Sequence, residues 1–337
     1  MTKSKSSSVD STVELQRKVQ AHADANDRQK KGASGKGGSK EKSGKAVQAG
    51  AHKEPENPLP PQHQRKPGNE SELDPRPLFI APDYLGSEKL KNKVALITGG
   101  DSGIGRAVAV LYAREGADVA IVYLSEDEDA EETRRHVEEE GGRCLLLRGD
   151  VRDPEFCKQA VAETIQTLGK LDILVNNAAF QEHAKSIDEI TEDQFDLTMK
   201  TNIYGYFHMV KAAMPYLSSG GSIINTGSET GLFGNKELLD YSTTKGAIHT
   251  FTRSLATNLL PRGIRVNAVA PGPVWTPLNP ADRSADEVEE FGNKSGMKRP
   301  AQPEEISPAY VFLASPVCSS YVTGIVLPVM GGVTPQG

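Results

Sequence analysis

The stretch KVALITGGDSGIGRAVAVLYAREG, residues 93–116, reads as a complete strand–turn–helix unit. Residues 93–100 are short, apolar and closed by glycines, which is typical of a buried strand. Residues 102–116 carry apolar side chains at helical spacing and end in glycine, which predicts a helix. Glycines let a backbone approach a pyrophosphate closely, and the helix N-terminus offers N–H groups and positive potential. We therefore expect a dinucleotide at this turn, rather than glycines that serve tight packing alone.

The alternation of strand and helix continues to the end of the chain. The predicted strands are 118–124, 144–151, 171–179, 221–228, 264–272 and 324–332. The predicted helices are 127–142, 154–169, 193–217, 240–260 and 304–315. Several strands are apolar throughout, as in parallel sheets covered by helices on both faces. We predict a single α/β domain over residues 93–337, a doubly wound Rossmann-type fold with a seven-stranded parallel sheet.

Residues 1–77 have a different composition, with 15 basic and 10 acidic side chains in a chain of net charge −6. Gly, Ser and Lys dominate 30–45, and 54–77 is Pro-rich, so we predict a disordered basic tail. A short helix within 11–27 is an alternative, although its apolar face is thin. The tail lacks interleaved aromatics, so we expect a solvated segment and no nucleic-acid partner. Residues 78–92 are expected to pack on the domain as an arm.

The overall composition is ordinary for a globular protein of 337 residues, with 37% hydrophobic and 25% charged residues. No apolar run approaches the roughly 20 residues of a membrane span, so we expect no membrane association. Cys144, Cys157 and Cys318 are widely spaced and form no metal-binding pattern. We therefore predict a cytoplasmic protein without a metal site.

Small and polar residues follow the predicted strands. Asp150 and Val151 end the strand 144–151, and Asn177 and Ala178 end the strand 171–179. Ligands of doubly wound folds bind at the carboxyl ends of the strands, so these residues are expected beside the nucleotide. A capping or turn role for Asp150 is the alternative.

A tyrosine and a lysine stand one helical turn apart in YSTTK, residues 241–245. This spacing places Tyr241 and Lys245 on one face of a helix. An exposed pair without a role is common, so the spacing alone is a weak signal. The pair gains weight because it follows the predicted strand that ends in NTGS, residues 225–228.

Five motifs together resemble those of the short-chain dehydrogenase/reductase family. They are TGGDSGIG (98–105), NNAA (176–179), NTGS (225–228), YSTTK (241–245) and APGPVWTP (270–277). The resemblance covers roughly residues 90–333. Within the family, the chain is similar to bacterial NADP-dependent aldehyde reductase and glucose-1-dehydrogenase-like members with an N-terminal extension. One departure is Ala179, where the family commonly has glycine, which puts the fine cofactor geometry in question.

The resemblance implies four catalytic residues. Tyr241 is the acid/base, Lys245 lies beside it and the nicotinamide ribose, Ser228 holds the substrate oxygen, and Asn202 supports a water-linked proton relay. The implied cofactor contacts are Gly99, Ser102, Ile104, Gly105, Tyr123, Asp150, Val151, Asn177, Ala178, Pro271, Gly272 and Thr276, with Tyr241 and Lys245. The resemblance also implies a homotetramer built through the helices at 192–217 and 240–260 and the C-terminal strand.

The chemistry of carbonyl reduction explains why these residue types suit the site. Hydride transfer builds negative charge on the carbonyl oxygen, which must receive a proton. A tyrosine with its ordinary pKa of about 10 is a poor base at neutral pH. We expect the ammonium of Lys245 to lower the pKa of Tyr241. Asn202 competes for backbone hydrogen bonds within an apolar helix, which predicts a local kink there.

The end of the second predicted strand bears on the choice of cofactor. An acidic residue at that position selects NAD by binding the ribose hydroxyls. Here the position is Tyr123, followed by Leu124 and Ser125, and we expect Glu126 to open the next helix rather than face the ribose. The sequence therefore predicts NADP(H) as the preferred cofactor, with NAD(H) possible.

We predict an NAD(P)-dependent oxidoreductase acting on a small-molecule carbonyl or alcohol, such as an aldehyde, a ketone or a sugar. A catalytically weak nucleotide-binding regulator is the alternative, although such a protein would not need Ser228, Tyr241 and Lys245. The polar, Pro-interrupted segment 276–300 predicts a mobile lid, and Trp275 before it is a candidate substrate contact. Deleting residues 1–77 is expected to leave activity and the thermal midpoint nearly unchanged.

Overall fold

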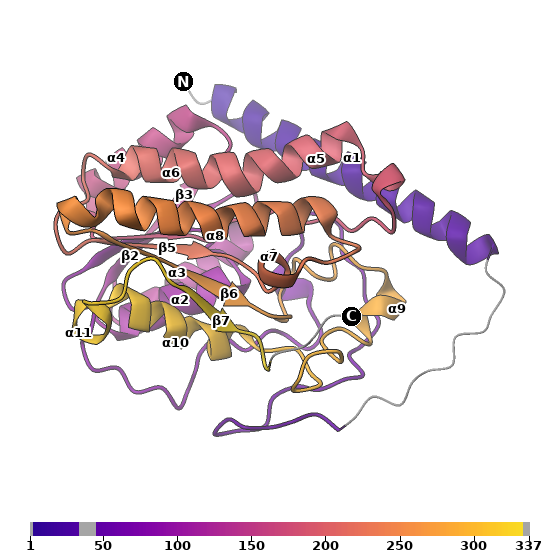
Figure 1. Cartoon of the computed structure of the whole chain (residues 1–337). Helices are drawn as coiled ribbons and strands as arrows, with labels where there is room; N and C mark the ends of the chain where they lie inside the picture. Colours follow the sequence, from indigo (N-terminus) through magenta and orange to yellow (C-terminus); the bar gives the residue numbers. More distant parts are fainter. Residues whose placement is uncertain (1–2, 34–44, 333–337) are drawn as a thin grey trace.

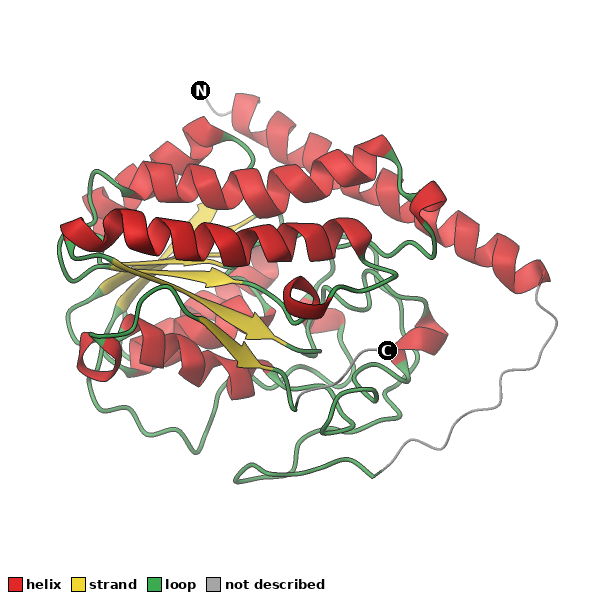
Figure 2. Cartoon of the chain, in the orientation of Figure 1, coloured by secondary structure: helices red, strands yellow, loops and turns green. Residues whose placement is uncertain are grey.

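The computed structural model describes residues 3–33 and 45–332, with side chains described for 8–30 and 45–332. Its centre is one seven-stranded sheet in which all neighbouring strands are parallel (Figure 2). The strands are β1 (Val94–Thr98), β2 (Asp118–Tyr123), β3 (Cys144–Arg148), β4 (Ile173–Asn176), β5 (Ser222–Thr226), β6 (Arg265–Pro271) and β7 (Val326–Val329). Their order, β3-β2-β1-β4-β5-β6-β7, confirms the predicted doubly wound α/β fold.

Helices cover both faces of this sheet (Figure 1). On one face lie α2 (Gly103–Arg114), α3 (Asp127–Glu139) and α10 (Pro303–Ala314), and on the other α4 (Pro154–Leu168), α6 (Gly205–Ala213) and α8 (Leu239–Leu259). The shorter elements are η1 (Glu70–Glu72), η2 (Ile187–Glu189), α5 (Glu192–Met199), α7 (Thr230–Phe233), η4 (Leu260–Arg262), α9 (Ala285–Val288) and α11 (Pro316–Ser319). Alternate residues of β1 enter the two cores, with Ala95 and Ile97 on the α2 side and Val94 and Leu96 on the α4 side.

The parallel register brings the strand ends, and the residues that follow them, to one edge of the sheet. Asn176 pairs with Asn225 across β4 and β5, and its side-chain amide donates to Asn225 Oδ1 at 2.9 Å. Thr98, the last residue of β1, accepts hydrogen bonds at Oγ1 from the backbone N–H groups of Asn177 (2.9 Å) and Ala178 (3.0 Å). These bonds fix the segments that leave the sheet at this edge.

The helix predicted over 193–217 is interrupted where Asn202 lies. Between α5 and α6 the chain forms a π-helical turn, η3 (Lys200–Tyr204). The Asn202 amide donates to Phe180 O at 2.9 Å, and Asn202 Oδ1 accepts from Phe180 N–H at 2.8 Å. The local irregularity expected from this asparagine is therefore present, and such widened turns often mark functional sites.

The described part of the segment 1–77 corrects the prediction of a disordered tail. Helix α1 (Lys3–Ala33) packs on α5, where Val19 is buried against Phe180 and Leu197. The Gly/Ser/Lys-rich stretch at 34–44 lies outside the described residues. The composition predicted disorder because the apolar face of α1 is weak. The buried contacts of α1 come from residues far along the chain.

Residues 45–77 also pack against the segment that was predicted to be a mobile lid. Leu59 and Leu73 join Trp275, Val288 and Phe291 in a small apolar cluster. Trp275 is fully buried there, and its indole N–H donates to Pro75 O at 2.7 Å, so it is no substrate contact. The following arm is anchored in the main core by Ala81 and Leu90.

No helix among the described residues has the length and apolar character that crossing a bilayer requires.

Candidate active site

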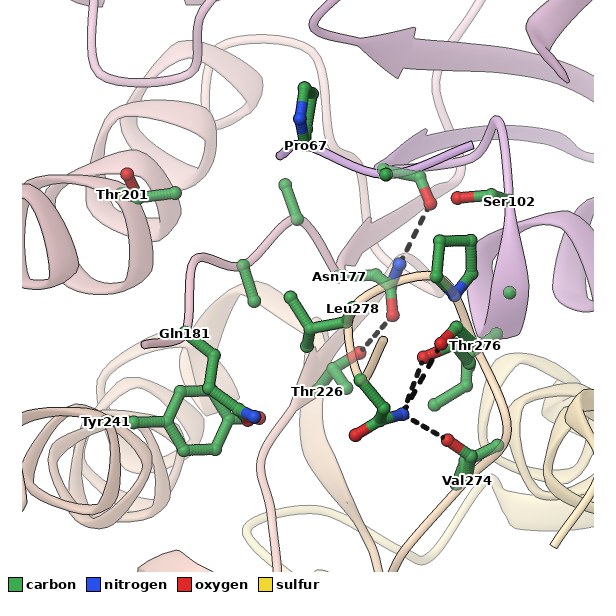
Figure 3. Close-up of a pocket in the computed structure, with 18 of the residues that line it drawn as sticks. Pro67, Ser102, Asn177, Gln181, Thr201, Thr226, Tyr241, Val274, Thr276 and Leu278 are labelled. Carbon is green, nitrogen blue, oxygen red and sulfur yellow. Dashed lines mark hydrogen bonds between the residues drawn. The ribbon is translucent and has the colours of Figure 1, made fainter. Parts of the chain in front are cut away.

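A cleft of about 310 Å³ lies at the carboxyl ends of the central strands (Figure 3). Most of the residues predicted for the site line it, from the glycine loop through the strand ends to α8. They are Gly99, Ser102, Ile104, Tyr123, Asp150, Val151, Asn177, Ala178, Ser228, Tyr241, Lys245, Pro271, Gly272 and Thr276. Gly105 and Asn202 are not among the lining residues, and both act from behind the cleft wall.

The glycine loop has a backbone that residues with a Cβ rarely adopt. Gly99 and Gly103 have φ angles of 62° and 51°, in the left-handed region that favours glycine. A Cβ on Gly105 would lie 1.8 Å from Gly99 O, so only glycine lets α2 begin against this turn. The N-terminus of α2 lines the cleft through Ser102, Gly103 and Ile104, and its positive potential favours an anionic group; here Gly103 N–H donates to the carboxyl oxygen Glu70 Oε2 at 2.5 Å.

The opposite end of the cleft holds the Ser, Tyr and Lys of the predicted catalytic set. Ser228 follows β5, whereas Tyr241 and Lys245 lie one turn apart on α8; their exposed fractions are 8%, 8% and 1%. Lys245 Nζ donates to Thr226 O at 2.8 Å and lies 5.3 Å from the centroid of the Tyr241 ring. The same carbonyl also accepts from Tyr206 Oη at 3.1 Å, which fixes the acceptor of the lysine.

Burial has the largest effect on the pKa values of Tyr241 and Lys245. It raises the pKa of Tyr241 above the ordinary value, while a hydrogen bond with Ser228 opposes the rise. Burial also lowers the pKa of Lys245 to about 7. Burial thus raises the pKa of Tyr241 and weakens the charge of Lys245 in the protein alone, and the lowering of the Tyr241 pKa by Lys245 stays a prediction. A phenol that keeps its proton at neutral pH is suited to donate it.

Asn202 reaches α8 from behind the cleft. Its side-chain amide donates to Thr244 Oγ1 at 3.1 Å as well as to the backbone of Phe180. Thr244 precedes Lys245 in the chain and in turn donates to Tyr241 O at 2.7 Å. Asn202 is thus connected to the helix that carries both catalytic candidates.

The end of the cleft near β2 carries two carboxyl groups, Asp101 and Glu126. Glu126 stands before the first turn of α3, as expected, but it also lines the cleft and accepts from Ser125 Oγ at 2.6 Å. Burial, and secondly the charge of Glu126, raise the pKa of Asp101 to about 7. The charge at this end therefore changes around neutral pH.

Polar groups also surround the space beside Tyr241. Gln181 lines the same cleft as Tyr241, and the Gln181 amide donates to Asp282 Oδ2 at 2.5 Å. Burial raises the pKa of Glu229, another lining residue, to about 7. Arg283 lies on the Phe291 ring, with 5.6 Å from its guanidinium carbon to the ring centroid. These donors and acceptors suit a substrate with polar groups beyond its carbonyl.

Sequence reasoning missed the part of the wall that the N-terminal extension supplies. Thr12 and Gln16 of α1, with Pro67 and Gly68, line the same cleft. One feature of the sequence could have indicated a packed helix here. The positions that are buried in α1 recur mostly every three or four residues. These positions are Val9, Thr12, Val13, Gln16, Val19, Gln20, Ala23 and Asp27. Half of them are polar, so their pattern did not stand out as an apolar face.

The chain is similar in sequence to known proteins. A family model described as enoyl-(acyl carrier protein) reductase matches residues 99–334. General stress protein 39 of Bacillus subtilis is 56% identical over 275 residues, covering 81% of this chain and 96% of that protein. The chloroplastic NADPH-dependent aldehyde reductase 1 of Arabidopsis thaliana is 47% identical over 273 residues, covering 79% and 95%.

A solved structure gives the same fold. A short-chain dehydrogenase from Burkholderia cenocepacia, crystallised in complex with NADP, superposes with a TM-score of 0.67 at 33% identity. The match covers 72% of this chain and 98% of that one.

Proposed function

The chain belongs to the short-chain dehydrogenase/reductase family, and on that premise we propose the reaction that it catalyses. It is an NAD(P)-dependent oxidoreductase that moves a hydride between nicotinamide and a carbonyl or alcohol, with an aldehyde, a ketone or a sugar as substrate. The observation that carries this proposal is the set of Ser228, Tyr241 and Lys245 at the edge of a cleft whose other end is a glycine loop.

The cleft residues fit a dinucleotide, and each catalytic candidate has a defined task. The bound nicotinamide supplies or accepts the hydride. Tyr241 donates its phenolic proton to the carbonyl oxygen as negative charge develops there. Ser228 Oγ donates a hydrogen bond to the same oxygen, and the ammonium of Lys245 stabilises the phenolate. Asn202 holds the π-helical turn behind α8, from which a water-linked relay returns the proton to Tyr241.

The test is oxidation of NADPH and NADH by the full-length protein in the presence of a panel of aldehydes, ketones and sugars. We expect turnover with at least one class of substrate and loss of the nicotinamide absorbance. Cofactor binding without turnover across the whole panel would contradict the enzymatic proposal.

We propose NADP(H) as the preferred cofactor, with NAD(H) also accepted. The support is Tyr123 at the end of β2, where a carboxylate would compete with a 2′-phosphate for the ribose. Tyr123→Asp is expected to shift the ratio of kcat/KM for NADPH and NADH toward NADH. An unchanged ratio in this variant would remove Tyr123 from the ribose site.

We also propose that the protein works as a cytoplasmic homotetramer. The thiols of Cys144, Cys157 and Cys318 are free, as expected in a reducing compartment. An apolar groove of about 230 Å³ runs between η3, α6 and α8, and Tyr204 and Phe207 at it are 55% and 47% exposed. Uncovered apolar faces of this kind favour self-association. Light scattering should give a tetramer, and Phe207→Asp should lower the mass; a monomeric wild type would overturn this proposal.

A further inference from the structure

The strand order fixes which end of the cleft takes which part of a dinucleotide. The reacting groups follow β5 and lie on α8, and the glycine loop that suits the pyrophosphate follows β1. Strands β2 and β3 lie on the other side of β1. An extended dinucleotide with its nicotinamide at Tyr241 therefore places its adenosine at the carboxyl ends of β2 and β3, beside Asp150.

Helix α1 forms the wall of the cleft at this adenosine end. Thr12 and Gln16 lie one helical turn apart on the same face of α1, and their exposed fractions are 2% and 6%. Thr12 Oγ1 donates to Asp150 Oδ2 at 2.6 Å, and Arg152 Nε donates to the same oxygen at 2.9 Å. The helix and the carboxylate are thus held in one fixed arrangement.

The rest of α1 is tied down by side chains on the same side of the helix. Gln20 Nε2 donates to Gln64 O at 2.8 Å and to Ala281 O at 2.9 Å. Asp27 pairs with Lys185 at 2.6 Å. Gln16 lies between these anchors and Thr12, so its side chain is directed at the cleft by contacts on both sides.

The side-chain amide of Gln16 has no hydrogen-bond partner within the part of the chain that the structure describes. The Gln16 side chain is largely buried, but its amide atoms reach the cleft, where a ligand can satisfy them. Adenine offers an N6 amine donor next to the N7 acceptor, and a glutamine amide binds this edge with two hydrogen bonds. We propose that Gln16 recognises the adenine ring of the cofactor through this edge, with Thr12 fixing the position of Asp150 beside it.

This inference rests on the proposed dinucleotide-dependent function, but it is tested by binding rather than by turnover. The probes are NADPH, its analogue with hypoxanthine in place of adenine, and reduced nicotinamide mononucleotide, which lacks the adenosine. Dissociation constants are measured by nicotinamide fluorescence for the full-length wild type, Gln16→Met and the control Glu14→Gln. Glu14 is exposed on the same helix. Hypoxanthine replaces the N6 donor by an oxygen, so the Gln16 amide can satisfy only one of the two positions.

We expect the wild type and Glu14→Gln to prefer NADPH over the hypoxanthine analogue, and Gln16→Met to reduce that preference by roughly tenfold. The affinity for reduced nicotinamide mononucleotide should be equal in all three proteins. An unchanged preference in Gln16→Met overturns the inference. Equal weakening of all three probes also overturns it, because it would show a structural role alone. A wild type that binds the probes as expected but turns over no substrate would instead contradict the proposed function.

Discussion

The two walls of the cleft are built in different ways. The inner wall consists of strand ends and of α2 and α8, whose backbone hydrogen bonds lie within the regular elements of the sheet domain. The outer wall consists of α1, residues 45–77 and the segment 276–300, which hold one another through side chains and through a few backbone hydrogen bonds, such as Gln64 N–H to Pro280 O at 2.9 Å. Gln20, for example, joins all three of these segments.

This difference separates the residues that carry out the reaction from the segments that control access to the cleft. The inner wall places Tyr241 and Lys245 at positions set by one helix, so their geometry does not depend on the outer wall. Apart from α1, the outer wall consists of loops with two short helical turns, η1 and α9, and segments with little regular hydrogen bonding open locally at low cost. A change in the inner wall should therefore affect the reaction, whereas a change in the outer wall should affect stability and cofactor binding.

The largest effect that this comparison predicts is that of Tyr241→Phe. The ring and its packing remain, but the proton donor is lost, so turnover should fall by about 10²–10⁴-fold. Cofactor affinity and the thermal midpoint should change little. Steady-state kinetics with the best substrate, and cofactor titration, measure the two effects. Tyr321→Phe is the matched control because Tyr321 is fully exposed. Retention of more than a tenth of the wild-type activity would remove Tyr241 from the mechanism.

The second prediction concerns a buried anchor of the outer wall. Lys66 Nζ donates to Gln181 O at 2.6 Å and pairs with Glu182 at 3.3 Å, and both side chains are almost fully buried. Burial raises the pKa of Glu182 to about 8, and the charge of Lys66 opposes that rise. With that pKa Glu182 is already mostly protonated at neutral pH, so Lys66→Met chiefly removes the buried charge-assisted hydrogen bond to Gln181 O and should destabilise the protein by about 2 kcal/mol.

Denaturant unfolding measures this loss, and a double variant tests its cause. Replacing Lys66 and Glu182 together by Met removes both buried polar groups of the pair, and it should recover most of the stability. If Lys66→Met unfolds at the wild-type denaturant concentration, the pair does not hold the extension in place.

These anchors also show why the sequence predicted one wall and not the other. Tyr241 and Lys245 could be placed because their relation is local, and the kink at Asn202 followed from a property of asparagine within a helix. The partners of Gln20 are up to 261 positions away, and no local pattern reports such a bond. The buried side of α1 carries Thr12, Gln16 and Asp27, so its hydropathy resembles that of a solvated tail.

The same reason explains the error at Trp275, which was interpreted as substrate-facing because its partners in residues 54–77 had been assigned to disorder. Once those residues pack, Trp275 is covered by Leu59 and Leu73. The segment 276–300 does line the cleft, and its mobility stays a prediction. The expectation that the tail can be deleted without effect follows the same assignment, and the buried anchors of α1 argue against it.

A smaller effect is predicted where the inner wall meets the adenosine. Burial raises the pKa of Asp101 to about 7, above its ordinary value, so the carboxyl is protonated below that pH and charged above it. A charged carboxylate repels a 2′-phosphate, whereas a protonated one can donate to it. The ratio of kcat/KM for NADPH to that for NADH should therefore fall several-fold from pH 6 to pH 8. Asp101→Asn should flatten this profile, and a profile that is already flat in the wild type would exclude Asp101 from cofactor selection.

The smallest predicted effect comes from an exposed anchor of the same outer wall. Lys18 Nζ pairs with Asp193 at 2.6 Å, but the two side chains are 72% and 53% exposed. Water and salt screen such a pair, and holding two long side chains in one geometry costs entropy, so it contributes less than about 1 kcal/mol. Lys18→Ala should therefore lower the thermal midpoint by no more than about 3 °C. Calorimetry measures the thermal midpoints of Lys18→Ala and Lys66→Met side by side. The comparison is between an exposed and a buried anchor of the same N-terminal extension. Equal losses in the two variants would mean that burial does not decide how the outer wall is held, and that α1 docks mainly through its surface charges.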